Sequence, residues 1–167
     1  MKTFVHIITG LGAAMLFLVL LSCSKADQPT IDNGPDKEQE QPKVEDTMPN
    51  QIKITISGKT LPIKIENNAA TKALVNILRS SSITFTASDY GGFEEVGNLG
   101  RSLPSSNSQI TAQPGDVILY SGNSIVLFYG SNSWSYTRIG RMQYSSLDEL
   151  KSFLKAGGGD VSVTLSL

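Results

Sequence analysis

The chain has 167 residues, a formal net charge of −1 at pH 7, one histidine and one cysteine. Both His6 and Cys23 precede residue 51, so residues 51–167 exclude Ser-His-Asp and Cys-His nucleophiles, zinc sites built on histidine or cysteine, and disulfides. Basic and acidic residues nearly balance in 51–167 and form no basic cluster, so no nucleic acid is expected as a partner.

The N-terminus has the pattern of an export signal. Lys2 precedes an apolar run, Ile7–Leu21, which is too short to be expected as a permanent membrane span. The run ends in Leu20-Leu21-Ser22-Cys23, which resembles the lipobox of bacterial lipoproteins, in which the cysteine is acylated and becomes the new N-terminus. The resemblance implies a signal peptide over 1–22, lipidation of Cys23, and a protein of the bacterial cell envelope that is lipid-anchored to a membrane. The alternative is an ordinary signal peptide in which Cys23 is incidental.

Residues 23–50 are interpreted as the lipidated cysteine and a disordered linker. After Cys23 the composition changes to proline, glutamine and charged residues, with acidic residues in excess and almost nothing apolar. Such a segment cannot bury enough apolar surface to offset its ordering entropy. The alternative is an acidic docking tail or a surface-export signal. Residues 51–167 then make one domain.

The first segment of that domain predicts a β-hairpin. Ile52–Ile56 and Leu61–Ile65 each alternate apolar and polar side chains, and Ser57-Gly58-Lys59 between them is a turn sequence. Proline cannot donate to a strand ladder, so Pro62 is expected at a sheet edge or a bulge.

A short helix, a strand and a loop are expected next. Asn67 or Asn68 can cap a helix over Ala69–Leu78, whose apolar residues share one face. Ile83–Ala87 returns to the alternation of a strand, and Asp89–Phe93 is expected to form a glycine-permitted loop.

The middle of the domain predicts the central strands. Gln113–Asp116 is a turn sequence, after which Val117–Tyr120 and Ser124–Tyr129 form two nearly continuous apolar runs joined by a tight turn. These runs are expected to cross the centre of the sheet. Trp134–Ile139 predicts a further strand.

The C-terminal segment predicts a second helix and a closing strand. Ser146-Leu-Asp-Glu149 is a capping box that opens a helix to about Lys155, and Gly157–Gly159 stops it. Val161–Leu165 alternates as a strand. Many short strands with two small helices indicate an all-β barrel or sandwich, and the positions of the helices favour a closed barrel with plugged ends.

Several longer motifs resemble those of the bacterial cyclophilin-like domains, small relatives of the cyclophilin barrel. The resemblance covers residues 51–167 and implies a closed eight-stranded barrel with two short helices. The motifs that carry it are Ser88–Gly97, Leu99–Pro104, Gln113–Tyr120 and Gly130–Gly140.

The activity of true cyclophilins is not expected to transfer. The resemblance implies that prolyl isomerisation needs a Phe-x-Arg strand followed by a Pro-x-Phe-x-x-Gln-Gly-Gly-Asp stretch, and the chain has neither. Arg101 and Arg138 are the guanidinium groups within the distinctive motifs, and either is able to reach a peptide carbonyl. The alternative for both is an ion pair with Glu94, Glu95 or Asp116.

A groove on the barrel side is the leading hypothesis for function. Ser133–Tyr136 resembles the strand that lines the proline pocket of true cyclophilins, with Tyr136 in place of its phenylalanine and Trp134 in place of its glutamine. We expect a binding or accessory module that accepts a small ligand or an extended peptide. Its groove candidates are Tyr90, Phe93, Arg101, Trp134, Tyr136 and Arg138.

Two alternatives remain for these residues. The aromatic side chains are equally well explained as barrel core or rim. The domain as a whole has a divergent peptidyl-prolyl isomerase as its alternative function, kept open by the fold.

No catalytic residue, cofactor or metal ion is expected. A carboxylate pair for glycoside hydrolysis among Asp89, Glu94 and Glu95 is disfavoured because adjacent residues of a strand face opposite ways. The glycines at 91–92 and 157–159 lack the spacing of nucleotide-binding loops.

Overall fold

A computed structural model of the chain describes residues 47–167, so the expected signal peptide, Cys23 and most of the linker lie outside the described residues. The described part contains nine strands and two helices. In chain order these are β1 (Gln51–Ile56), β2 (Lys59–Ile65), α1 (Ala69–Ser80), β3 (Ile83–Tyr90), β4 (Glu94–Asn98), β5 (Ser108–Ala112), β6 (Asp116–Tyr120), β7 (Ser124–Phe128), β8 (Asn132–Met142), α2 (Leu147–Leu154) and β9 (Val161–Ser166).

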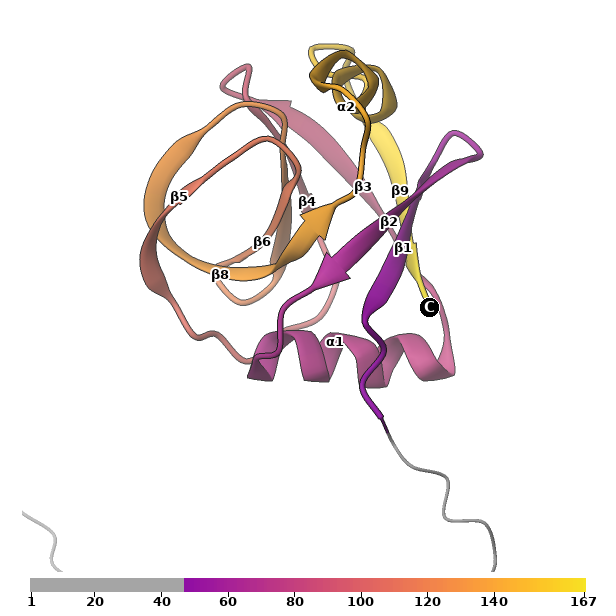
Figure 1. The fold of residues 1–167 in the computed structure, drawn as a ribbon, viewed down its shortest axis with the longest axis vertical. Coiled ribbons are helices and arrows are strands. Elements are labelled where there is room, and N and C mark those ends of the chain that lie inside the picture. The colour runs from indigo at the N-terminus through magenta and orange to yellow at the C-terminus, as the bar shows by residue number, and fades with distance from the viewer. Residues whose placement is uncertain (1–46) are drawn as a thin grey trace, which may run out of the picture. The chain divides into compact units, whose positions relative to one another are not determined.

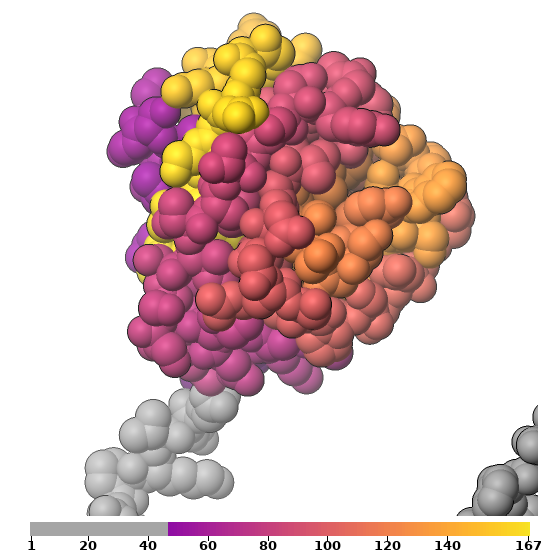
Figure 2. Space-filling view, turned by 180° about the vertical axis from the view of Figure 1, so that it is seen from behind, coloured from indigo at the N-terminus to yellow at the C-terminus, as the bar shows by residue number. Residues whose placement is uncertain are grey.

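Eight of the strands close into an antiparallel barrel (Figure 1). The order around the wall is β2-β1-β9-β3-β4-β7-β6-β8, and β8 pairs with β2 to complete the ring. The C-terminal strand β9 lies between β1 and β3, next to segments from the first half of the domain (Figure 2). The expected all-β, eight-stranded barrel with two short helices is confirmed, and β5 is an extra strand that pairs with β8 outside the ring.

The two helices close opposite ends of the barrel (Figure 1). Leu74 and Val75 of α1 and Leu150 and Leu154 of α2 are buried in the same apolar cluster as the inward-facing strand residues. Burying these side chains removes apolar surface from water at both ends of the ring, which is the main stabilising effect available to a domain without disulfides. Neither helix of residues 47–167 is long and apolar enough to cross a membrane.

Both helices begin at the predicted caps. The Asn68 side chain accepts a hydrogen bond from the Thr71 backbone N–H at 3.0 Å, and Ser146 Oγ accepts one from the Glu149 N–H at 3.2 Å. These bonds satisfy amide groups that have no partner within the helix. α2 ends at Leu154, and its C-cap Lys155 adopts a left-handed conformation with φ 55°, before the glycine run that was expected to stop the helix.

The chain between β3 and β6 differs from the expectation. Asp89 and Tyr90 were expected in a loop but are the last residues of β3, and the turn is confined to residues 91–93, where both glycines have positive φ. β4 and β5 had no counterpart among the predicted strands. Their sequences carry little apolar alternation, because β4 contains two adjacent glutamates and β5 is mostly polar.

Pro62 sits at the border of the pairing between β2 and β8. That ladder begins at Ile63, which pairs with Met142, and the Pro62 carbonyl accepts a hydrogen bond from the Gln143 N–H at 2.8 Å, just past the end of β8. The missing N–H of proline therefore falls where the ladder ends, as the edge position predicts.

Residues 47–50, within the expected linker, contact the domain. Met48 packs against the main core, the Thr47 carbonyl accepts from Arg79 Nη2 at 3.2 Å, and the Asn50 carbonyl accepts from the Ile65 N–H at 3.2 Å. The packing of the domain therefore begins before β1.

The long strand β8 belongs to two layers. Its residues 137–142 pair with β6 and β2 in the barrel wall, whereas residues 132–136 pair with β5. A bulge interrupts the β6 pairing, because Val117 pairs with Gly140 while the next residue, Ile118, pairs with Arg138. Bulges bend a strand and increase its twist, so the first part of β8, residues 132–136, turns away from the wall. We call β5 together with residues 132–136 the arm.

Replacing Gly140 by alanine is expected to destabilise the barrel at its closure. An added Cβ would lie 2.4 Å from the Lys64 carbonyl oxygen, which belongs to the backbone of the neighbouring strand and has no side-chain freedom to move away. We expect a loss of about 1–3 kcal/mol in the free energy of unfolding, measured by urea denaturation. Ser135→Ala, at an exposed position of the same strand, is the control; equal stabilities of the two variants would show that the closure tolerates a side chain.

Candidate functional site

The part of the wall formed by β7 and β6 is apolar on both faces. Leu127 and Leu119 point into the barrel and join the main core, while Val126 and Ile118, their neighbours along the strands, point outward. A sheet face covered with valine, isoleucine and phenylalanine must be shielded from water, and the arm lies over it. The residues of this second, outer cluster are Ala112, Ile118, Val126, Phe128 and Tyr136, with Phe93, Val96 and Ile110 packed at its border.

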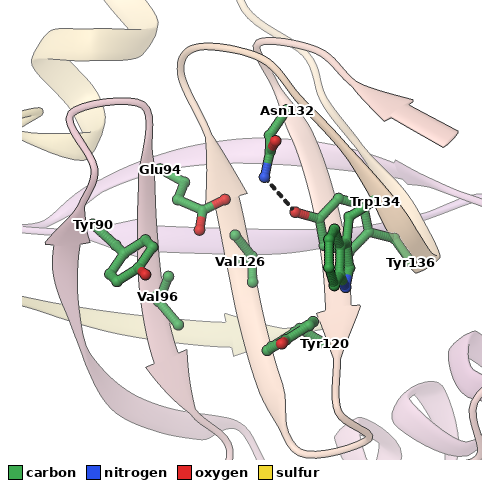
Figure 3. Close-up of a pocket in the computed structure, with 8 residues that line it drawn as sticks. All are labelled: Tyr90, Glu94, Val96, Tyr120, Val126, Asn132, Trp134 and Tyr136. Atoms are coloured by element: carbon green, nitrogen blue, oxygen red, sulfur yellow. Dashed lines mark hydrogen bonds between the residues drawn. The ribbon is translucent and has the colours of Figure 1, made fainter.

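The arm leaves part of this outer face uncovered, and a pocket of about 390 Å³ results (Figure 3). One side of the pocket is the barrel wall, from the end of β3 across β4 and β7 to the end of β6. The other side is the first half of β8, whose alternate residues face the wall. The lining residues are Tyr90, Glu94, Val96, Tyr120, Val126, Asn132, Trp134 and Tyr136.

Aromatic rings stand at the mouth of this pocket and inside it. Tyr90 is 65% exposed and Trp134 is 56% exposed, which are high values for large side chains with apolar rings. Tyr136 is buried, accepts a hydrogen bond from Asn132 Nδ2 at 3.0 Å, and packs edge to face against Tyr120 with 6.2 Å between ring centroids. Exposed rings above a buried, hydrogen-bonded ring are typical of a binding surface.

A carboxyl group lies among these rings. Glu94 is only 6% exposed, and its Oε2 has no hydrogen-bond partner among the described residues. Burial raises the pKa of Glu94 to about 7, because the charged form loses the water that would solvate it. No lysine or arginine of the described chain lines the pocket. Buried polar atoms are nearly always paired, so an unpaired carboxyl oxygen is exceptional in a residue that lines a pocket.

Three of the six residues predicted from sequence meet in this pocket, namely Tyr90, Trp134 and Tyr136. Phe93 does not line the pocket; it packs at the border of the outer cluster and stacks on Phe128, with 6.3 Å between ring centroids. Arg101 is exposed in the connection between β4 and β5 and does not line the pocket.

Arg138 is held in ion pairs away from the pocket. Its Nη2 lies 3.2 Å from Asp116 Oδ2 and its Nη1 lies 3.5 Å from Glu66 Oε1. The expected alternative of an ion pair with Asp116 is therefore confirmed for Arg138. Asp116 is completely buried and also accepts from Arg141 Nε at 2.8 Å, so its charge is shared between two guanidinium groups.

Sequence reasoning did not place the remaining lining residues in the groove, above all Glu94 and Tyr120. Tyr120 lies two residues after Ile118 and therefore on the same strand face, but Val117–Tyr120 is apolar throughout, so the sequence gives no sign of which face is outward. Glu94 lies two residues before Val96 and therefore on the same strand face. This spacing is the local sequence signal from which its position on the apolar face could have been predicted.

Glu95 points the other way, into the barrel. It pairs in register with Leu127 of the main core, it is fully buried, and neither of its carboxyl oxygens has a partner within residues 47–167. Burial, together with the negative charges of Asp89 and Asp160, raises the pKa of Glu95 to about 7. The two adjacent glutamates thus face opposite ways, as the strand geometry predicted.

Asp89 is the best-satisfied carboxylate near this interior group. It accepts hydrogen bonds from the Tyr129 hydroxyl and from the Gly157 N–H, the latter at 3.0 Å, and the bond from Tyr129 is the main reason that the pKa of Asp89 is lowered. Within residues 47–167 no group of three or more histidine, cysteine, aspartate or glutamate side chains is placed to hold a metal ion.

Comparison with known proteins identifies a family and a similar solved structure. The sequence model of the Cyclophilin-like family matches residues 54–166. The solution structure of a hypothetical protein from Archaeoglobus fulgidus is similar, with 19% sequence identity, 70% of this chain and 92% of that chain covered, and a TM-score of 0.48. None of the curated proteins matches the chain.

The buried glutamates predict that stability falls as pH rises from about 5 to about 8. The folded state holds the protons of Glu94 and Glu95 more tightly than the unfolded state, because the pKa of each rises from 4.5 to about 7 on folding. Stability from the neutral forms is therefore complete below the unfolded value and is lost as pH passes through the folded value.

Glu95→Gln is expected to remove half of this effect. The amide has the shape of the protonated acid but no charge, so the variant should be more stable than the parent by about 1–3 kcal/mol near pH 8 and nearly equal to it near pH 5. Urea denaturation at both pH values measures this, with Asp148→Asn at an exposed position as the control. A parent protein whose stability stays constant between these pH values would contradict the assignment.

Proposed function

This chain belongs to the Cyclophilin-like family, and we propose that its domain is a binding or accessory module whose outer-wall pocket accepts a small organic ligand or an extended peptide. The observation that carries the proposal is the combination of exposed rings and an unpartnered buried carboxyl at one place. Tyr90 and Trp134 leave apolar surface in contact with water, and Glu94 leaves a polar atom without a partner. A ligand that fills the pocket relieves both unfavourable conditions.

The pocket is also large enough and sufficiently preformed for such a role. Its volume of about 390 Å³ falls in the range of small-molecule sites. Strands from both sides fix its walls, and Tyr136 is held by Asn132 and by its ring contacts. A site built on strands needs little ordering when a ligand binds, which favours affinity.

The divergent isomerase is the less favoured alternative. A prolyl isomerase must stabilise the twisted amide more than the planar one, and in true cyclophilins a guanidinium serves this purpose according to the resemblance. Here Arg138 is paired with Asp116 and Glu66, and Arg101 does not line the pocket. Isomerisation of Ala-Pro peptides far above the uncatalysed rate, abolished by Arg101→Ala or Arg138→Ala, would restore this alternative.

The proposal includes a membrane tether through Cys23. It is supported by the sequence Leu20-Leu21-Ser22-Cys23 at the end of an apolar run, and by the polar, proline-punctuated composition of the segment that separates it from the domain. In this arrangement the domain is carried by a lipid-anchored protein of the bacterial cell envelope.

Ligand binding is testable through Trp134, because it is the single tryptophan of the chain and it lines the pocket. We expect members of a panel of short peptides and small aromatic or aliphatic metabolites to shift its fluorescence emission in a saturable way. Tyr90→Ala should weaken the same ligands about fivefold to tenfold, because it removes ring contact but no core packing. Leu147→Ala, an exposed apolar residue of α2, is the control. A panel without any saturable response at millimolar concentration would count against the pocket.

Cys23→Ala is expected to release the protein from the membrane. Each methylene of an acyl chain contributes about 0.8 kcal/mol of membrane affinity, so losing the chains should move the protein from the detergent phase to the aqueous phase in a detergent partition of membrane fractions. Ser24→Ala, next to the cysteine, should leave the partition unchanged. If the Cys23 variant stays in the detergent phase, another feature anchors the protein.

A further inference from the structure

We propose that the pocket selects an organic ammonium group, either a primary aliphatic amine or its methylated form. This inference rests on the proposed function, because it names the chemistry of the ligand that the same pocket accepts. It is drawn from the negative charge that Glu94 brings to the pocket and from the attraction of tyrosine and tryptophan rings for cations.

The pocket contains an acid without a matching base. Glu94 lines it, is almost fully buried, and has an oxygen without a partner, while no lysine or arginine of residues 47–167 lines the pocket. The nearest base along β8 is Arg138, whose guanidinium is already shared between Asp116 and Glu66. A buried carboxylate is strongly unfavourable unless it is paired and hydrogen-bonded, so a bound cation supplies what the protein lacks.

The rings around Glu94 suit a cation as well. Figure 3 shows the Glu94 carboxyl between Tyr90 on one side and Trp134 with Tyr136 on the other. The face of an aromatic ring carries partial negative charge and attracts ammonium groups, most strongly for tryptophan and most of all for methylated ammonium ions that are weakly hydrated. Acid and rings together therefore favour the same class of ligand.

An aliphatic chain can accompany the charged group. Val96 and Val126 contribute apolar lining on the barrel-wall side of the pocket. The volume of the pocket exceeds that of an ammonium head, so an alkyl chain of several carbons fits beside these valines. A lysine side chain has this form, and so does a free alkylamine.

Ligands of other charge are disfavoured by the same acid. An anion would meet the Glu94 carboxylate without any compensating base. A neutral carbonyl would need the protonated form of Glu94 as a donor, so its affinity would fall as pH rises through about 7, the pKa of this group. The affinity of an ammonium ion would rise over the same range, because its partner is the charged form. The sign of the pH dependence therefore separates the two classes.

The test compares probes that share one alkyl chain and differ in charge. The full chain, purified in detergent, is titrated with n-butyltrimethylammonium, n-butylamine, n-butanol and butyrate, and binding is followed by Trp134 fluorescence and calorimetry. Near pH 8 we expect both cations to bind at least about tenfold more tightly than butanol, and butyrate to bind most weakly. Near pH 5.5 the advantage of the cations over butanol should fall about tenfold or more, because Glu94 is then mostly protonated.

Two variants assign the effect to the pocket. Glu94→Gln should remove the preference for cations over butanol and its pH dependence, and Asp148→Asn, which changes an exposed acid outside the pocket, should keep both. Tyr90→Leu keeps an apolar side chain but no ring, so it should weaken the cations several-fold more than butanol. Thermal melting verifies that each variant is folded. If Glu94→Gln does not fold, the Tyr90 variant alone tests whether the pocket selects cations over butanol.

The outcomes separate this inference from the function on which it rests. Butanol or panel peptides that bind as tightly as the cations would overturn the selection of ammonium and leave the binding pocket in place. Cations that fail to bind while no member of the panel binds would overturn both. If ammonium is selected, the ligand class follows from comparing butylamine with Nα-acetyl-lysine amide, which keeps a free side-chain ammonium group. Tighter binding of the lysine derivative indicates a lysine side chain of a peptide, and tighter binding of butylamine indicates a free amine.

Discussion

The whole arrangement depends on one strand that serves two sheets. β8 must pair with β2 to close the barrel and with β5 to form the arm, and a bulge between these two parts allows the change of direction. At the closure the strands approach so closely that a Cβ on Gly140 would meet the backbone of β2. The arm covers the outer wall because the closure fixes where β8 leaves the ring, and the pocket is the part of that wall that the arm leaves open.

The same strand decides the electrostatics of the pocket. Arg138 and Arg141 follow the arm along β8, and both are bound by the buried carboxylate of Asp116 on β6. These charge-assisted contacts cross the wall at the base of the arm. They hold these two guanidinium groups at Asp116, and no lysine or arginine of residues 47–167 lines the pocket beside Glu94.

Glu94 and Glu95 show how strongly a strand separates neighbours. One carboxyl enters the pocket and the other enters the barrel, so two adjacent and identical side chains experience different surroundings. Among the described residues, Oε2 of Glu94 and both carboxyl oxygens of Glu95 lack a partner, and each group is less stable in its charged form than it would be in water. Folded proteins retain such groups mainly at sites of function, because a sequence selected only for stability would replace them with apolar residues.

The sequence by itself determined the local elements and, through resemblance, the closed barrel. The hairpin, the Asn68 and Ser146 caps and the central strands were predictable because alternation and capping involve residues a few positions apart. Tyr90, Trp134 and Tyr136 were also identified, by their motifs. Only the tertiary structure decided the bulge in β8, the Asp116 partnership of Arg138, and the burial of Glu94. Each of these depends on strands that are distant in sequence and adjacent in space, and a side chain's burial and pKa follow from such neighbours rather than from its own segment.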